Sequence, residues 1–153
     1  MKKALVFFVI VIFVFVSFGC NNGGESSLGT LVYNGQNFAL VMGSLAVFGA
    51  NGTIPESYDI DIALADGSGS NSIYLDLNSD QLSVLSVGTY TWSAVRAVFT
   101  LVDAGTFTGI WDTAVSGTVT VTQSGSQYSL QWNLTMSSGA TVSGNYTGPL
   151  QVF

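Results

Sequence analysis

The sequence predicts an all-β domain, either an antiparallel β-sandwich or a closed β-barrel of about ten strands. Three observations support this prediction. Apolar and polar residues alternate along several short segments, which is the period of a half-buried strand. Turn signals such as Asn-Gly and Ser-Gly separate these segments at the spacing of about 8–12 residues that is typical of sandwiches and barrels. Strand and helix patterns do not alternate along the chain, and this excludes parallel α/β architectures.

The first strands of the domain are predicted from turn signals as much as from hydrophobicity. Residues 31–33 are followed by Asn34-Gly35, a strong signal for a type I′ hairpin. Residues 38–48 (FALVMGSLAVF) are apolar apart from Gly43-Ser44, where we expect a bulge or bend. Alanine, leucine and methionine would also favour a helix here, but the flanking turns, including Asn51-Gly52, favour a strand.

The central strands show the clearest alternation. Residues 58–64 place two sets of side chains on opposite faces: Tyr58, Ile60, Ile62 and Leu64 on one, and Asp59, Asp61 and Ala63 on the other. We expect the aspartate face to be in water. Residues 66–71 (DGSGSN) predict a turn, and 73–77 alternate again. Strands are then predicted at 89–92, after Gly88, and at 95–102, with Arg96 on one face.

The C-terminal third predicts an antiparallel meander. A short strand at 107–111 precedes longer ones at 115–122, 128–134 and 141–147. The turns between them are at Ser124-Gly125 and Ser138-Gly139, and Gly148-Pro149 ends the last strand. Because Trp132 shares a face with apolar neighbours, namely Tyr128, Leu130 and Leu134, we expect it in the core.

The first twenty residues predict export from the cytoplasm. Lys2 and Lys3 precede an apolar run at 4–18 whose only polar member is Ser17, as in a secretory signal peptide. The run is shorter than the ~20 apolar residues that span a bilayer. We therefore expect a signal at 1–19, a flexible tether at 20–29 and a single domain at 30–153.

The end of this signal, Ser17-Phe18-Gly19-Cys20, resembles the lipobox of bacterial lipoproteins. Gly19 fits that pattern, but leucine is usual in place of Ser17 and a small residue in place of Phe18. The resemblance implies that Cys20, the chain's only cysteine, is the lipidated N-terminus of an envelope protein, most often one of the outer membrane. Ordinary signal cleavage, which would leave Cys20 as a free thiol, is the alternative.

Charge limits the partners of the mature chain. Two of the three basic residues are the signal lysines, so Arg96 alone faces nine acidic residues, a formal charge of −8. Such a surface repels the phosphates of nucleic acids, and it would also be repelled by an anionic bilayer. We expect a membrane association through the lipid and no nucleic-acid partner.

The residue inventory predicts neither an enzyme nor a cofactor or metal site. The chain has no histidine, which excludes a Ser-His-Asp triad and histidine-ligated metals. Asp59 and Asp61 are about 7 Å apart along a strand, within the separation of glycosidase carboxylates, but we expect both in water. The segment 66–71 alternates oxygen-bearing side chains as calcium loops do, yet it lacks the glycine and glutamate of such loops and predicts a turn.

Aromatic residues are the remaining binding candidates. Tyr90 and Trp92 share a strand face, and Trp111 lies at a strand end. Aromatic side chains on a β-sheet surface can stack on sugars. We therefore predict Tyr90, Trp92 and Trp111 as a ligand-binding set.

A family resemblance covers short pieces of the chain. Residues 117–121 (GTVTV), 128–130 (YSL), Gly139, 144–148 (GNYTG) and Gly88-Thr89-Tyr90 are similar to segments of small secreted lipoproteins from Bacteroidetes-type bacteria, which are mostly uncharacterised. The resemblance implies an envelope location and an all-β fold, calycin-like in some members. The expected function is a non-enzymatic binding or structural module with a glycan or envelope-protein partner. The alternative is a calycin-like barrel that carries a small apolar ligand.

Overall fold

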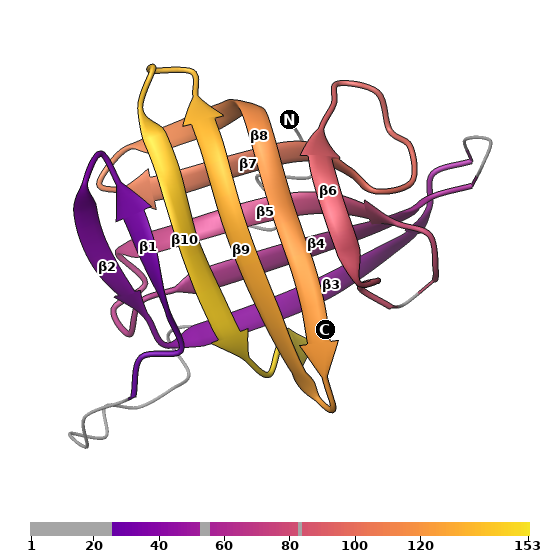
Figure 1. Ribbon diagram of the computed structural model, residues 1–153, viewed down its shortest axis with the longest axis horizontal. Coiled ribbons are helices and arrows are strands. Elements are labelled where there is room, and N and C mark those ends of the chain that lie inside the picture. Colours follow the sequence, from indigo (N-terminus) through magenta and orange to yellow (C-terminus); the bar gives the residue numbers. More distant parts are fainter. Residues whose placement is uncertain (1–25, 53–55, 83) are drawn as a thin grey trace.

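The computed structural model describes residues 26–52, 56–82 and 84–153, which form a single sheet of eleven strands (Figure 1). The predictions for the signal and for Cys20 fall on residues outside this part. The all-β class is confirmed. The strands are β1 (Gly29–Tyr33), β2 (Gln36–Leu40), β3 (Met42–Ala50), β4 (Tyr58–Ala65), β5 (Asn71–Ser79), β6 (Gly88–Trp92), β7 (Thr100–Thr108), β8 (Trp111–Ser124), β9 (Gln127–Met136), β10 (Thr141–Gly148) and β11 (Gln151–Val152). Among the described residues, no helix has both the length and the apolar character that a membrane crossing requires.

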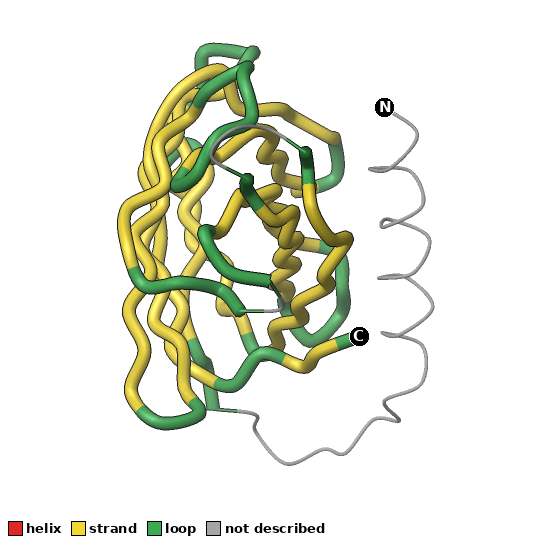
Figure 2. The backbone as a smooth tube through the Cα atoms, turned by 90° about the vertical axis from the view of Figure 1, so that its right-hand side faces the viewer, coloured by secondary structure: helices red, strands yellow, loops and turns green. Residues whose placement is uncertain are grey.

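The sheet curls into a half-barrel. Its strand order is β11-β3-β4-β5-β7-β6-β8-β9-β10-β1-β2. The strands β3, β4, β5 and β7 form one side, and β6, β8, β9, β10 and β1 cross them steeply on the other (Figure 1). The side view shows the same curl in the backbone (Figure 2). Most neighbouring strands are antiparallel, but β11 pairs with β3 and β6 with β7 in parallel.

The sheet is neither a sandwich nor a closed barrel, so this detail of the prediction was wrong. The two end strands of the sheet, β11 and β2, do not pair with each other. A barrel would close if β2 paired with the free edge of β3. That edge is taken by β11, through Gln151 opposite Ser44 and Val152 opposite Leu45. The chain instead turns from β2 to β3 across Val41 alone. The fold is therefore one curled sheet whose two ends meet at a corner.

Large apolar side chains fill the space between the two sides of the sheet. Alternate residues of nearly every strand contribute to one buried cluster, which includes Leu31, Ile62, Leu75, Val121 and Tyr146. Trp132 is 3% exposed within it, so its predicted core position is confirmed. The interior of the curled sheet is therefore the hydrophobic core.

Two boundaries differ from the sequence prediction. The segment 38–48 is extended as predicted, but its break lies at Val41 and not at Gly43-Ser44. Residues 93–99 form a loop where a strand over 95–102 was predicted, and β7 begins only at Thr100. Phe99, which ends this loop, has a φ of 56°, a conformation that a strand cannot contain. Its ring packs at 5.3 Å from that of Tyr90, so core packing fixes the loop.

The remaining turns and strands follow the predicted pattern closely. Asn34 and Gly35 have φ values of 49° and 78°, as a type I′ hairpin requires. The strand β8 covers the predicted strand at 115–122, with an irregularity between Ala114 and Ser116, and shares only Trp111 with the predicted strand at 107–111. Its residue Gly117 has a φ of 132°, and an added Cβ would lie 2.2 Å from the carbonyl oxygen of Asn133. Only glycine fits at that close approach.

Candidate functional site

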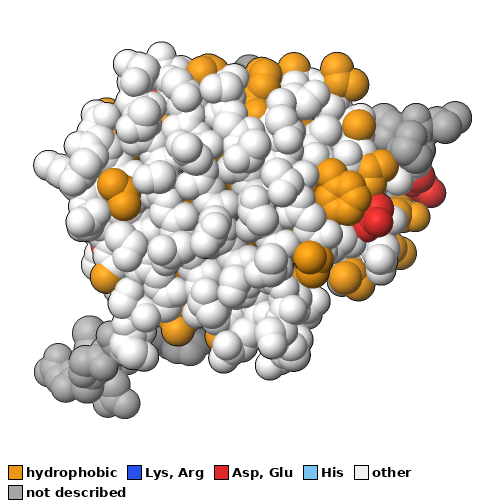
Figure 3. Space-filling model, viewed as in Figure 1, with side chains coloured by type: hydrophobic (Ala, Val, Ile, Leu, Met, Phe, Trp, Pro, Cys, Tyr) orange, Lys and Arg blue, Asp and Glu red, His pale blue; other side chains and the backbone are white. Residues whose placement is uncertain are grey.

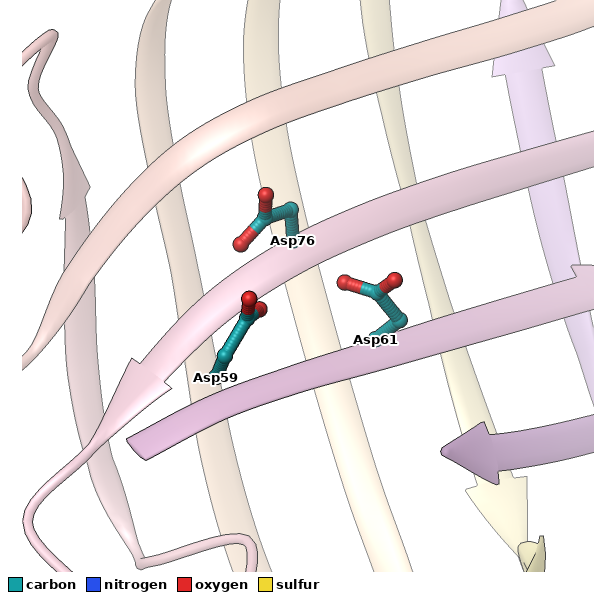
Figure 4. A group of neighbouring side chains, drawn as sticks. All are labelled: Asp59, Asp61 and Asp76. Atoms are coloured by element: carbon teal, nitrogen blue, oxygen red, sulfur yellow. The ribbon is translucent and has the colours of Figure 1, made fainter. Parts of the chain in front are cut away.

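Three carboxylates meet on the outer face of β4 and β5. Asp59 and Asp61 come from β4 and Asp76 from β5, and one oxygen of each lies within 4.8 Å of those of the other two. Asp61 is directly opposite Asp76 in the ladder. Because Ile60 and Ile62 point into the core, the intervening aspartates point to the opposite face. Figure 4 shows the three carboxyl groups on one side of these strands, turned toward one another.

The burial of these aspartates overturns the prediction that they face water. Asp59 and Asp61 are each 2% exposed, and Asp76 is 6% exposed. Alternation along a strand predicts which residues share a face, but it does not predict whether that face is covered. Here both faces of β4 and β5 are buried along most of their length. The loop before β7 brings Arg96 to the cluster.

Arg96 is the positive partner of the cluster. Its Nη2 lies 2.8 Å from Asp76 Oδ2 and its Nη1 3.1 Å from Asp76 Oδ1, so the guanidinium binds that carboxylate with both nitrogens. Nη1 also lies 3.4 Å from Asp59 Oδ1 and donates a hydrogen bond of 3.3 Å to Asn78 Oδ1. The Arg96 side chain is 27% exposed. One guanidinium thus contacts two of the three carboxylates and the amide oxygen of Asn78.

The environment raises the proton affinity of the cluster. Burial and, next, the negative charge of Asp76 raise the pKa of the Asp61 carboxyl to about 8, against a hydrogen bond from Tyr74 that lowers it. Burial also raises the pKa of Asp76 to about 6, although the hydrogen bonds from Arg96 lower it. Burial and the neighbouring carboxylates raise the pKa of the Tyr74 hydroxyl as well. At neutral pH the arrangement therefore favours a protonated Asp61.

One oxygen of Asp61 is left without a hydrogen bond. Tyr74 serves the Asp61 carboxyl, but Oδ1 is buried and has no hydrogen-bond partner among the described residues. Buried polar atoms are normally paired, and an unpaired one costs about 1–3 kcal/mol. The Asp61 carboxyl group faces the other two carboxylates (Figure 4), so its unpaired oxygen belongs to the cluster.

The predicted aromatic set does not form one surface. Tyr90 is fully buried, and its hydroxyl donates a hydrogen bond of 2.8 Å to the Ser86 carbonyl oxygen. Its predicted exposure was wrong because the face it shares with Val119 and Val121 is the core face. Trp92 is half-buried and packs against the same core. Trp111 is 42% exposed.

Trp111 lies on the same outer face as Tyr74. Gly105 is directly opposite Tyr74 in the ladder, so the two positions share a face. An added Cβ at Gly105 would lie 2.1 Å from Trp111 Cζ2. The indole therefore rests on the backbone of β7, where a larger residue would displace it. Tyr74 in turn hydrogen-bonds to the Asp61 carboxyl. Of the predicted aromatic set, Trp111 is therefore on the same face as the carboxylate cluster, with Tyr74 between them.

The other predicted loop is a turn, as expected. Asp66 Oδ1 accepts hydrogen bonds from the backbone N–H groups of Ser68 and Ser70, and Asp66 Oδ2 accepts one from the Asn71 amide. These bonds occupy the oxygens that a cation would need.

Charge is scarce on the opposite side of the molecule. The face over β8, β9 and β10 consists mainly of uncharged polar side chains, with isolated apolar ones (Figure 3). The exposed residues there include Thr118, Gln131, Asn133, Thr135, Asn145 and Thr147. The candidate chemistry therefore lies on the β4–β5 side.

No protein-family model matches this chain, and neither a curated protein nor a solved structure matches it. The function is therefore argued from the geometry of its own residues.

Proposed function

We propose that this chain is a non-enzymatic binding protein of the bacterial cell envelope, held at the outer membrane by a lipid on Cys20, and that its ligand is a glycan. The observation that supports a glycan ligand is the exposed indole of Trp111, which lies against Gly105 beside Tyr74. A flat exposed indole offers an apolar surface for a sugar ring, and neighbouring polar groups can bind its hydroxyls. The resemblance to envelope lipoproteins supports the location.

Replacing Trp111 with alanine should weaken glycan binding at least tenfold and leave the fold intact, because the exposed part of the ring contributes mainly to ligand contact. The measurement is a glycan array followed by titration of the best ligand, with circular dichroism as the folding check. Gly105→Ala is a second variant, since its Cβ would displace the indole without removing it. It should weaken binding as well.

Phe153→Ala is the matched control, because Phe153 is another exposed aromatic, 52% exposed, and it follows β11, which β3, β4 and β5 separate from β7 and Trp111. It should bind as the unaltered protein does. Equal binding by Trp111→Ala and the unaltered protein would contradict the proposal. Binding of an envelope protein, with no binding of any glycan, would indicate that the partner is a protein and not a sugar.

A carboxylate hydrolase is the second candidate, and the raised pKa of Asp61 beside Asp76 is the observation that favours it. A retaining glycosidase has two carboxyls about 5–5.5 Å apart, one of them with a raised pKa. Against this, Asp61 is 2% exposed and Arg96 binds both oxygens of Asp76. Turnover of a glycan that disappears in Asp61→Asn would favour the hydrolase over the binding protein.

The lipid anchor has its own test. Intact-mass analysis of protein extracted from membranes should show residues 20–153 plus acyl chains, because a lone cysteine at the end of a signal is suited to thioether lipidation. Two or more acyl chains give stable anchoring. Cys20→Ala should release the protein from the membrane once the signal is cleaved. An unmodified mass at Cys20 would contradict the anchor.

A further inference from the structure

The carboxylate cluster has the dimensions of a calcium site. Calcium binds oxygen ligands at 2.3–2.6 Å, so ligand oxygens on opposite sides of the ion are about 4.6–5.2 Å apart. One oxygen each from Asp59, Asp61 and Asp76 satisfies this limit, since the three lie within 4.8 Å of one another. Magnesium, with bonds of about 2.0–2.1 Å, demands near-octahedral geometry and usually binds through only one or two carboxylates plus water. The all-oxygen donor set also disfavours zinc and copper.

A second observation points to a ligand within the cluster. Asp61 is only 2% exposed, and its Oδ1 has no hydrogen-bond partner among the described residues. The carboxyl group that carries this atom is turned toward the other two carboxylates (Figure 4). A cation bound there would give this oxygen a partner.

The charges of the cluster are also unbalanced. Three carboxyl groups gather around a single guanidinium, and that guanidinium is engaged mainly with Asp76. Buried carboxylates are usually paired or coordinate a metal ion. With all three carboxyl groups ionised, their negative charge exceeds the single positive charge of Arg96, and a divalent cation would balance the excess.

We propose that Asp59, Asp61 and Asp76 form a binding site for a divalent cation, with calcium as the ion that fits best, and that Arg96 lies next to this ion as an opposing positive charge. Water completes the coordination shell. This proposal does not rest on the glycan ligand. It also departs from the sequence-based expectation, which included no metal site.

Calcium binding is measured by isothermal titration of the full-length protein in detergent, after chelation and dialysis. The unaltered protein should bind one calcium ion. Asp61→Asn should weaken binding at least tenfold, because it removes the unpaired carboxyl oxygen and the negative charge that Asp61 gains when the cation displaces its proton. Arg96→Gln should strengthen binding severalfold, because it removes a positive charge next to the ion.

Asp80→Asn is the matched control: it makes the same chemical change at an exposed residue and should keep the affinity of the unaltered protein. Terbium luminescence provides a second readout, since Tyr74 contacts the Asp61 carboxyl and can transfer excitation energy to a bound lanthanide. If Asp61→Asn does not fold, Tyr74→Phe replaces it and should reduce this luminescence. No calcium binding by the unaltered protein, equal binding by Asp61→Asn, or weaker binding by Arg96→Gln would overturn the site.

Discussion

A chain in which Tyr90 is replaced by alanine should lose about 3–5 kcal/mol of unfolding free energy, the usual cost of removing a large aromatic side chain from a core. Tyr90 is fully buried and packs edge-on against Phe99. Phe99 in turn ends the loop that carries Arg96. The cavity left by the substitution would therefore open next to the segment that positions the charged site. Urea unfolding followed by fluorescence measures the change.

Tyr90→Phe separates the ring from its hydroxyl. It removes only the hydrogen bond to the Ser86 carbonyl oxygen and should cost about 1–2 kcal/mol. A loss below about 1 kcal/mol in the alanine variant would mean that Tyr90 is a surface residue, as the sequence alone predicted.

The protein should become less stable as the pH rises from about 4 to about 8 in a calcium-free buffer. The Asp61 carboxyl has a pKa of about 8 in the folded protein and an ordinary value of 3.8. Between these values the folded chain holds a proton that the unfolded chain has released. The unfolding free energy therefore falls as pH rises, by up to about 1.4 kcal/mol for each pH unit. The raised pKa of Asp76 adds to this loss up to about pH 6.

Asp61→Asn should remove most of this pH dependence and make the protein more stable than the unaltered chain at pH 9, because the amide imitates the protonated acid. Chemical unfolding at a series of pH values tests this. Asp80→Asn should retain the original slope. A variant Asp61→Asn with an unchanged slope would show that Asp61 is ionised in the folded protein throughout this range.

The sequence predicted the class of the fold and most of its strands because period-two alternation and turn residues are local signals. Asn34-Gly35 and Ser138-Gly139 are turns where predicted, and β9 and β10 match their predicted segments closely. The curl of the sheet was not predictable in this way. Nor was the strand that occupies the edge of β3: β11 pairs there with a distant segment, and a two-residue strand has no periodicity to detect.

Local sequence signals predicted part of the candidate site. The turn at 66–71 joins β4 to β5, and its position alone places Asp61 opposite Asp76. Two features were beyond local patterns. Arg96 lay in a predicted strand, because apolar residues surround it, whereas packing of Phe99 makes that segment a loop. The burial of the aspartate face depends on tertiary contacts, and alternation carries no information about them.

The pairing of β1 with β10 has a consequence for how the chain folds. Gly29 lies opposite Tyr146, so the first strand of the described chain takes its place beside one of the last. Its hairpin with β2 is local and can form within microseconds, but it can dock only after β10 is available. Such distant pairing slows folding to the millisecond-to-second range, and until docking occurs the edge of β10 is open to other strands. The domain therefore completes its folding with its own first hairpin.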